Sequence, residues 1–447
     1  TTGTLNTLVG GLSGDALTIG NSNVAIGHQA LTTEVAGDRS IAIGLNALRY
    51  QTNASTTDVY NVAVGYEAGA AVTTGAYNTI VGGLAGDALT TGASNVAIGY
   101  LALSTEDAGG ANVAVGHSAL KDQDAGDAYN TALGYHSGKS ITTSIKNVII
   151  GGLAGDALTS GSKNTVVGYE ALSTEDTRGT STAIGHRALR DQNAGSDPYN
   201  VAVGHDAGLL VSTGVQNTII GGLAGDALTT GSDNVALGYA ALSLEDTGNR
   251  SVAIGRAALG SQNNDANNYN VGIGYNAGTT ITSGVRNVLI GGLSGDALTS
   301  GSDNIAIGYQ ALSTENAHGK NIAIGKDALL ALDAGADAYN VAIGHQAGLS
   351  VSTGINNTLV GGLAGDALTT GSYNVALGFD ALSTEDTGTR SIAIGYYALR
   401  NQNYNGEALN IAIGHLAGFN VTTGVQNVIV GGLAGDALTT GGGNVAM

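Results

Sequence analysis

The sequence predicts an all-β protein, a parallel β-solenoid or β-roll of about 26 coils, each roughly 17 residues long. Three observations support this prediction. A pentapeptide of Asn or Ser, an aliphatic residue, a small residue, a second aliphatic residue and Gly recurs along the whole chain. Most copies begin 17 residues after the preceding one, and Gly makes up 73 of the 447 residues. Because interior Gly costs a helix roughly 0.5–1 kcal/mol relative to Ala, so much Gly argues against a helical fold.

The positions of one coil can be assigned to strand and turn if the Asn or Ser of the pentapeptide is numbered 0. Aliphatic residues at positions 1 and 3 alternate with a small residue at position 2, as in Val235, Ala236 and Leu237, which indicates a strand with one face toward a core. Position 4 is Gly in every complete coil, which indicates a positive φ or the close approach of another backbone. Leu or Val at position 8 or 11 marks a second short extended stretch, and Gly is usual at position 14. We therefore expect two short strands and two turns in each coil.

The Asn at position 0 has two interpretations. Asn side chains repeated in successive coils can stack into an amide ladder that bonds along the solenoid axis. Asn is also a common turn former. The sequence alone leaves both roles open.

A longer period is superimposed on the 17-residue coil. Spacings that depart from 17 residues run from 18 to 21, and they recur once in every four coils. Gly221 to Gly291 and Gly291 to Gly361 are both 70 residues, made up of three spacings of 17 and one of 19. The prediction is a four-coil super-repeat within a single continuous solenoid over residues 1–447. We interpret this array as part of a longer fibrous protein, because both of its ends would expose unpaired strand edges.

The composition excludes several classes of function. The chain carries 16 Lys and Arg against 35 Asp and Glu, a formal charge of −19, which disfavours nucleic acid and anionic lipid as partners. No apolar run approaches the roughly 20 residues that a spanning helix needs, so no membrane insertion is expected. The absence of Cys removes disulfides and thiolate metal sites. There is no phosphate loop, nucleophile elbow or zinc-type His spacing, and near-identical repeats supply no unique catalytic constellation. We predict that the chain is not an enzyme.

Position 5, directly after the Gly, carries an exposed series of Tyr and His. A phenol cannot replace an imidazole as general base or metal ligand, so the interchange of Tyr and His argues against catalysis. A surface stripe that contacts a protein or sugar partner is the better interpretation, because Tyr presents a flat apolar face and a hydroxyl. The predicted stripe is His28, Tyr66, Tyr100, His117, Tyr135, Tyr169, His186, His205, Tyr239, Tyr275, Tyr309, His345, Tyr396 and His415.

Calcium is the one cofactor that the sequence raises. The recurrent segment GGLAGDAL resembles the calcium-binding nonapeptide of RTX proteins, but it returns only about every 70 residues, whereas that motif needs tandem copies. Separately, Asp226 should stand one coil below Glu245 and Asp246, where calcium would bridge the three carboxylates. Exposed acids in turns are the commoner case. We therefore predict no cofactor, with calcium at these three residues as the alternative.

The motif NVAIG with a small residue three positions after the Gly resembles the head repeats of YadA-like trimeric autotransporter adhesins. It is clearest in NVAIGYLA from Asn95 and NIAIGYQA from Asn304, and the resemblance extends from Asn6 to Met447. It implies a left-handed parallel β-roll assembled as a homotrimer. Similar repeats also resemble parts of bacteriophage tail fibres.

The residues themselves give a separate argument for the trimer. A 17-residue coil encloses only two or three aliphatic side chains, which is a thin core. Small residues at positions 2 and 7 would let copies approach along a flat face and bury Ala surface at roughly 25 cal/mol per Å². The sequence therefore predicts a homotrimer, with a monomeric solenoid as the alternative.

Taken together, these patterns predict an extracellular structural or adhesive fibre segment, the head or filament of a cell-surface or virion fibre. Its partners would be copies of itself, in a homotrimer or filament, and a host-surface protein or glycan. Within the same architecture the alternative is a bacteriophage tail-fibre shaft or receptor-binding fibre. Outside it, the alternative is a calcium- or glycan-binding repeat module.

Overall fold

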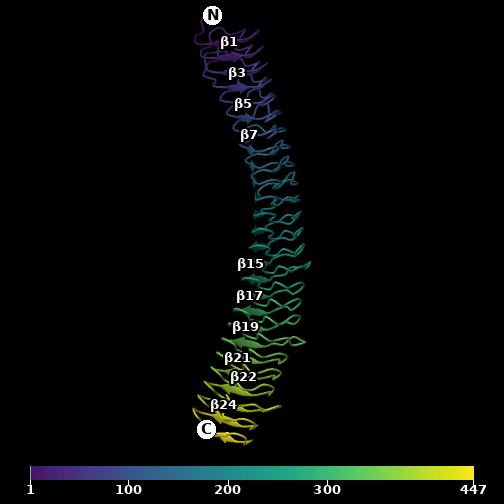
Figure 1. Cartoon of the computed structure of the whole chain (residues 1–447), viewed down its shortest axis with the longest axis vertical. Helices are drawn as coiled ribbons and strands as arrows, with labels where there is room; N and C mark the ends of the chain where they lie inside the picture. Colours follow the sequence, from purple (N-terminus) through teal and green to yellow (C-terminus); the bar gives the residue numbers. More distant parts are fainter. Residues whose placement is uncertain (1) are drawn as a thin grey trace. The chain divides into compact units, whose positions relative to one another are not determined.

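The computed structural model describes residues 2–447 and divides into two compact units, Thr1–Gly222 and Leu223–Met447. Each unit is a parallel β-solenoid with one short strand per coil, and in the described residues no helix occurs. Figure 1 shows the strands of each unit stacked in chain order. The predicted all-β solenoid of about 26 coils is confirmed. The predicted single continuous array over residues 1–447 stays a prediction.

The strands coincide with the pentapeptides. The first unit contains β1 (Thr7–Val9), β2 (Val24–Ile26), β3 (Ile41–Ile43), β4 (Val62–Val64), β5 (Thr79–Val81), β6 (Val96–Ile98), β7 (Val113–Val115), β8 (Thr131–Leu133), β9 (Val148–Ile150), β10 (Thr165–Val167), β11 (Thr182–Ile184), β12 (Val201–Val203) and β13 (Thr218–Ile220). The second unit contains β14 (Val235–Leu237), β15 (Val252–Ile254), β16 (Val271–Ile273), β17 (Val288–Ile290), β18 (Ile305–Ile307), β19 (Ile322–Ile324), β20 (Val341–Ile343), β21 (Thr358–Val360), β22 (Val375–Leu377), β23 (Ile392–Ile394), β24 (Ile411–Ile413), β25 (Val428–Val430) and β26 (Val445–Ala446).

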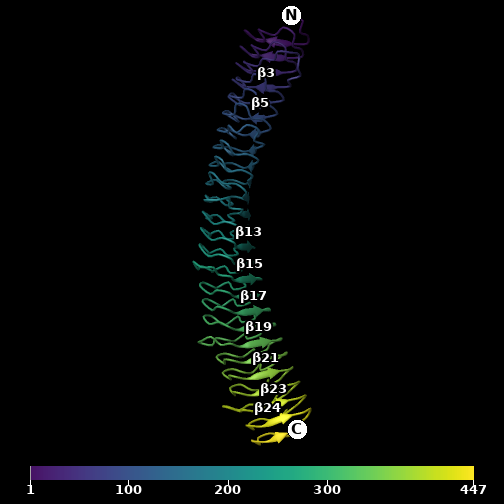
Figure 2. The ribbon, with the colours of Figure 1, turned by 180° about the vertical axis from the view of Figure 1, so that it is seen from behind.

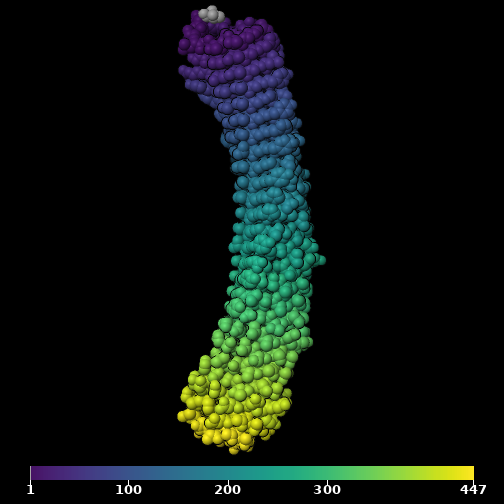
Figure 3. Space-filling model, viewed as in Figure 1, coloured from purple at the N-terminus to yellow at the C-terminus, as the bar shows by residue number. Residues whose placement is uncertain are grey.

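Within each unit, every strand pairs in parallel with the next one in the same register. Between β4 and β5, for example, Val62, Ala63 and Val64 lie opposite Thr79, Ile80 and Val81. Seen from behind, the arrows of the second unit all point the same way (Figure 2), and the coils of the first unit form stacked surface layers (Figure 3). Each position of a coil therefore lies beside the same position of the next coil, and side chains form columns.

The residues at positions 2 and 7 face the core, and the aliphatic residues at positions 1 and 3 lie on the outer side of the strand. Ala236 at position 2 and Ala241 at position 7 are fully buried, whereas Val235 is partly exposed and Leu237 is 39% exposed. The predicted flat outer face of small residues at positions 2 and 7 is therefore wrong. Position 2 packs against the neighbouring coil: a Cβ added to Gly272, at position 2, would lie 2.7 Å from Cγ of Leu259 in the preceding coil.

The stretch that follows the Gly of position 4 forms the second wall of the coil. It is a turn and not a strand, so the prediction of two strands per coil is wrong. Ala240 at position 6 and Leu242 at position 8 have φ of 53° and 54°, in the left-handed region. Two such residues within three positions are incompatible with an extended strand. Hydrogen bonds still link this wall to the next coil, as from Leu242 N–H to the Ala258 carbonyl at 3.1 Å.

Two kinds of coil fill the core in complementary ways. In one kind, position 8 is a buried Leu, such as Leu48. In the other, position 8 is Gly and position 11 is aliphatic, as in Gly69 and Val72. A Cβ added to Gly69 would lie 2.8 Å from Cδ1 of Ile80 in the next coil and 3.2 Å from Cδ2 of Leu48 in the preceding one. The Gly therefore leaves space that neighbouring coils occupy.

The Asn at position 0 is a buried connector between coils. Asn78 is fully buried, and its side-chain Nδ2 donates to the Gly92 carbonyl of its own coil at 2.9 Å. Its Oδ1 accepts the backbone N–H of Asn95 in the next coil, also at 2.9 Å. The ladder interpretation holds in this form: each amide bonds mainly to backbone groups, and through them the bonds run up the stack.

Candidate functional site

All residues of the predicted Tyr and His stripe are exposed at the surface. Within each unit the structure brings them together as a column, because position 5 follows an in-register strand in every coil. Tyr239, for instance, is 54% exposed and lies directly after Gly238, whose φ is +137°. A Cβ on Gly238 would lie 2.5 Å from the Gly255 carbonyl oxygen, so both predicted reasons for Gly at position 4 hold.

The stripe is interrupted. Each GGLAGDAL or GGLSGDAL coil has Gly at position 5, and this Gly leaves groups of three side chains between the gaps. We call these groups the aromatic triplets, although Leu45, Arg256 and Lys326 also belong to them, and the sequence-based stripe omitted Phe379. The triplets are His28–Leu45–Tyr66, Tyr100–His117–Tyr135, Tyr169–His186–His205, Tyr239–Arg256–Tyr275, Tyr309–Lys326–His345 and Phe379–Tyr396–His415.

Within several triplets neighbouring rings are in contact, in a tilted or a stacked arrangement. The ring centroids of Tyr100 and His117 are 5.4 Å apart, and those of Tyr396 and His415 are 5.5 Å apart with an interplanar angle of 9°. In the triplet of Tyr239, Arg256 and Tyr275, the Arg256 guanidinium lies 5.6 Å from the centroid of the Tyr275 ring. Such rows of partly exposed rings are suited to contact the flat faces of sugars or an apolar protein surface.

Buried glutamates at position 11 are a feature that the sequence analysis did not identify. They occur about every 70 residues and none of them is exposed to solvent, although a carboxylate is rarely fully buried unless it is paired. The sequence does contain a signal for these buried glutamates: in most cases a Gln stands at position 11 of the next coil. The buried glutamates are Glu34, Glu106, Glu175, Glu245, Glu315 and Glu385.

Glu34 shows how such a carboxylate is accommodated. Its Oε1 accepts the backbone N–H groups of the next three residues, the shortest bond being 2.7 Å from Gly37. Its Oε2 accepts Nε2 of Gln51 and Nδ2 of Asn53, both at 2.8 Å. Burial alone would raise the pKa of Glu34, but the hydrogen bonds from Gly37, Asn53 and Gln51 outweigh it and lower the pKa below 4.5.

The same arrangement bears on the calcium alternative. Glu245 is not an exposed turn acid, because it accepts bonds from Gly248 N–H at 2.7 Å, Gln262 Nε2 at 2.8 Å and Asn268 Nδ2 at 2.9 Å. Asp246 uses Oδ1 to accept the backbone N–H of Thr247. Calcium binding by Asp226, Glu245 and Asp246 stays a prediction, and an ion there would compete with the donors that Glu245 already has.

The aspartates of the GGLAGDAL-type segments are the opposite case. Oδ1 of Asp87, Asp156, Asp296 and Asp366 is buried and accepts no hydrogen bond. Burial raises the pKa of each, and for Asp366, where the nearby charge of Asp380 adds to the effect, the pKa is about 6. These carboxylates are therefore destabilising when they are ionised.

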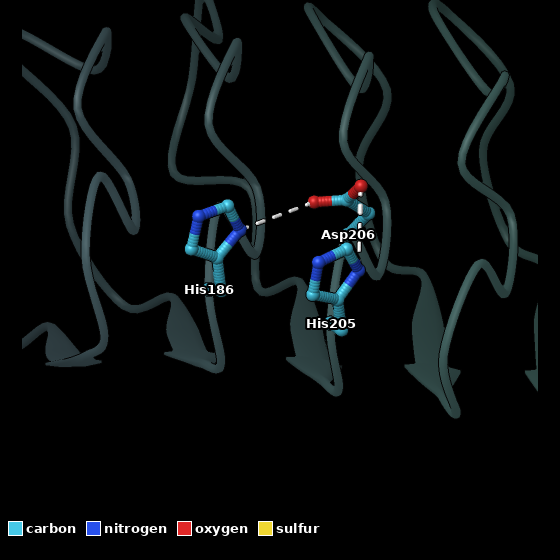
Figure 4. Close-up of side chains that lie close together, drawn as sticks. All are labelled: His186, His205 and Asp206. Atoms are coloured by element: carbon cyan, nitrogen blue, oxygen red, sulfur yellow. Dashed lines mark ion pairs between the residues drawn. The ribbon is translucent and has the colours of Figure 1, made fainter.

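Three groups of His, Asp and Glu in the described chain have ligand atoms within 4.8 Å of one another, the spacing that one metal ion needs. One contains Glu106, Asp107 and Asp124, and a second contains Glu315, His318 and Asp333. The third contains His186, His205 and Asp206, and it belongs to an aromatic triplet (Figure 4).

A hollow of about 630 Å³ lies beside the first of the longer coils. Its lining is mostly polar and includes Asn53, Thr57, Asp58 and Tyr77. The ring of Tyr77 stacks on that of Tyr60 at 6.0 Å. Polar groups beside an aromatic ring are a combination that can bind a sugar.

Comparison with known proteins assigns no family. No protein-family model matches the chain, and no curated protein matches it. Among residues 2–447, no helix is available that could cross a bilayer.

The hydrogen-bonded cage around Glu34 predicts a specific sensitivity. In Glu34→Gln, the new amide N–H groups would face backbone N–H donors, so we expect a loss of about 2 kcal/mol in unfolding free energy at pH 7. Because the folded-state pKa is lowered, the cage stabilises the wild type above about pH 4.5, and this contribution disappears as the pH falls through the folded-state pKa. Equilibrium denaturation at pH 7 and pH 3 measures both effects. Glu407→Gln, at an exposed site, is the control, and an equal loss in both variants would contradict the cage.

Asp366, whose buried Oδ1 has no hydrogen-bond donor, predicts the opposite pH dependence. Because its pKa is raised to about 6, the ionised carboxylate reduces stability increasingly as the pH rises from about 4 to above 6. Asp366→Asn should therefore stabilise the protein at pH 8, by on the order of 1 kcal/mol after discounting for solvent screening, and should have no effect at pH 3. Asp436→Asn is the matched control, since Asp436 has the same place in its motif but is exposed. A destabilised Asp366→Asn at pH 8 would show that the carboxylate has a partner.

Proposed function

We propose that the chain is a segment of an extracellular fibre, a head or filament with a structural and adhesive role, and that it is not an enzyme. The observation that supports this most is the repetition of the aromatic triplets. Six triplets occupy the same position of in-register coils, so the surface offers one kind of contact many times. Repetition of weak contacts suits adhesion, because once one contact has formed, the linked contacts bind at a raised effective concentration.

We further propose that the four-coil super-repeat is the functional period of the fibre. Three coils supply one triplet, and the GGLAGDAL-type coil supplies the Gly that separates it from the next. The resemblance to YadA-like head repeats points to the same role at a cell surface. A bacteriophage tail-fibre shaft would use the same architecture, and it is the alternative to a cell-surface origin.

The proposed fibre is a homotrimer, and the face that supports this differs from the one expected from the sequence. Positions 1 and 3 point outward, so the sheet of each unit has columns of aliphatic side chains, including Ile98 at 36% and Ile343 at 37% exposure. About 20 such side chains at roughly 40 Å² each would supply the roughly 800 Å² per partner of a standard interface. A second copy of the chain fits best, because only a partner with the same axial period can match the face coil by coil.

Solution mass tests the assembly. The wild type should have three times the monomer mass of 44.0 kDa by light scattering. The double variant Leu237→Lys and Ile343→Lys should shift the mass to the monomer, because each Lys would bury a charge in the apolar face. Tyr239→Lys, on the aromatic stripe, is the control and should leave the mass unchanged. A wild-type mass of 44.0 kDa would exclude the trimer.

The adhesive role predicts loss of binding from a single triplet. On a glycan array and on host-cell surfaces, Tyr100→Ala with Tyr135→Ala should reduce the number and strength of contacts, and binding should fall severalfold. Tyr129→Ala is the matched control, because Tyr129 is 58% exposed but lies outside the triplets. Equal binding by the wild type and the double variant would contradict a contact role for the triplets.

A glycan-binding module is the second candidate, and the hollow beside Tyr77 is the observation that favours it. In the same binding measurements Tyr77→Ala separates the two candidates. Loss of glycan binding in this variant, with the triplet variant unaffected, would place recognition in the hollow. Loss in the triplet variant alone would leave the fibre surface as the contact.

A further inference from the structure

We propose that His186, His205 and Asp206 form a binding site for one divalent transition-metal ion, such as Zn²⁺, on the surface of the unit Thr1–Gly222 (Figure 4). This inference goes beyond the proposed function and does not depend on it. It rests on the positions of the two imidazoles and the carboxylate, on the group that orients the carboxylate, and on a comparison with the other triplets.

The register of two strands brings the imidazoles together. In β11 and β12, Ile184 lies opposite Val203, and each His stands two residues after its strand residue. The two rings are consequently stacked with centroids 4.9 Å apart and an interplanar angle of 6°. The side chains are 43% and 62% exposed, so both rings can turn about their side-chain bonds.

The carboxylate lies to one side of the stacked rings, and dashed lines in Figure 4 join it to both imidazoles. Nδ1 of His186 is 3.6 Å from Oδ1 of Asp206, and Nδ1 of His205 is 3.4 Å from Oδ2. Ligands in a tetrahedral zinc site, each about 2.0–2.2 Å from the ion, lie roughly 3.4 Å from one another. Both nitrogen-to-oxygen distances are close to this value, but the two nitrogens face different oxygens of the carboxylate. Rotation of the two exposed rings out of their stack would bring both nitrogens to one ion.

Asp206 is held in place by two other contacts. Its backbone N–H donates to the carbonyl of His186 at 2.9 Å, and its side chain is only 7% exposed. Arg187 clamps the carboxylate, with Nε 2.9 Å from Oδ1 and Nη2 2.6 Å from Oδ2. Each carboxylate oxygen can accept more than one bond, so the clamp leaves capacity for an ion on the imidazole side. Arg187 then acts as the outer partner that orients a metal-binding carboxylate.

The other triplets show that this combination of residues is unusual in the chain. The residues equivalent to His186, His205 and Asp206 are Arg256, Tyr275 and Asn276 in the next triplet and Lys326, His345 and Gln346 in the one after it. The strands and the turn are the same in these copies. Only the ligand set differs, and this provides natural comparison sites within the same molecule.

The two other groups of potential ligands are weaker candidates. Glu106 accepts Gly109 N–H at 2.7 Å and Gln123 Nε2 at 3.0 Å, so both its oxygens are already engaged. Glu315 accepts three successive backbone N–H groups through Oε1. A metal ion would have to displace these donors, whereas at His186 and His205 it would replace only the contacts of two exposed imidazoles with Asp206.

The chemistry of the three ligands indicates the class of metal. Two imidazoles and one carboxylate favour Zn²⁺, Cu²⁺ or Ni²⁺ over Ca²⁺ and Mg²⁺, which prefer oxygen ligands. The chain has no Cys, so no thiolate competes for such an ion. Three protein ligands leave at least one coordination position for water or for a donor from a bound partner.

Calorimetric titration of the metal-free full chain with ZnCl₂ tests the site. We expect one Zn²⁺ per chain, and we expect His186→Gln and His205→Gln each to weaken binding at least tenfold. Both His side chains are exposed, so these variants should fold, and thermal unfolding without metal should match the wild type. The visible absorption of bound Co²⁺ gives a second measurement. Tetrahedrally coordinated Co²⁺ absorbs strongly, and this absorption should be lost in both variants.

Two His→Gln controls separate this site from general binding of Zn²⁺ to histidines. His117→Gln removes the pair with His136, whose rings are 5.5 Å apart, and His345→Gln removes a lone stripe histidine. Both should bind one Zn²⁺ with wild-type affinity. The proposal is overturned if the wild type binds no Zn²⁺ below roughly 100 µM, if several ions bind with equal affinity, or if His117→Gln weakens binding as much as His186→Gln.

Discussion

The close approach of successive coils at the Gly of position 4 is the constraint on which the other features of each unit depend. At Gly308, an added Cβ would lie 2.4 Å from the carbonyl oxygen of Gly325, and φ is +141°. No other residue can combine that φ with that contact without strain. Because the contact recurs between successive coils of each unit, it fixes the register of the strands. The fixed register places the buried Asn of one coil against the backbone of the next.

The parts of the fold that follow from this constraint could be predicted from sequence, because Gly at position 4 and Asn at position 0 are almost invariant. The direction of the side chains could not. The alternation in Val235–Ala236–Leu237 shows that one face of the strand is buried but does not say which face. The usual preference for burying larger residues led to the wrong prediction that the small residues face outward. The second wall was misjudged for a related reason. Leu242 has φ of 54°, which a non-Gly residue adopts only when its surroundings impose it, and nothing in the local sequence signals this.

The candidate sites divide in the same way. The stripe could be predicted because position 5 is exposed in any arrangement that puts Gly at position 4 in the turn. The buried glutamates could not be predicted, because a Glu such as Glu385 is normally exposed to solvent. The hydrogen bonds that Glu385 accepts from Gly388 N–H and Gln402 Nε2 exist only once the coils are stacked. The group of His186, His205 and Asp206 was missed because two of its members are a full coil apart in sequence, and only the register makes them neighbours.

The buried carboxylates show how the same scaffold has opposite electrostatic consequences at two positions. At position 11 the backbone turns its N–H groups toward Glu34, so ionisation is favoured and acid weakens the fold. At Asp366 the carboxylate oxygen is buried without a donor, so ionisation is disfavoured and base weakens the fold. The contributions of the two groups to stability therefore change in opposite directions as the pH rises. Substitutions at these positions will therefore move the stability of a unit in directions that net charge does not predict, since each removes one acidic group but only one of them removes a set of satisfied hydrogen bonds.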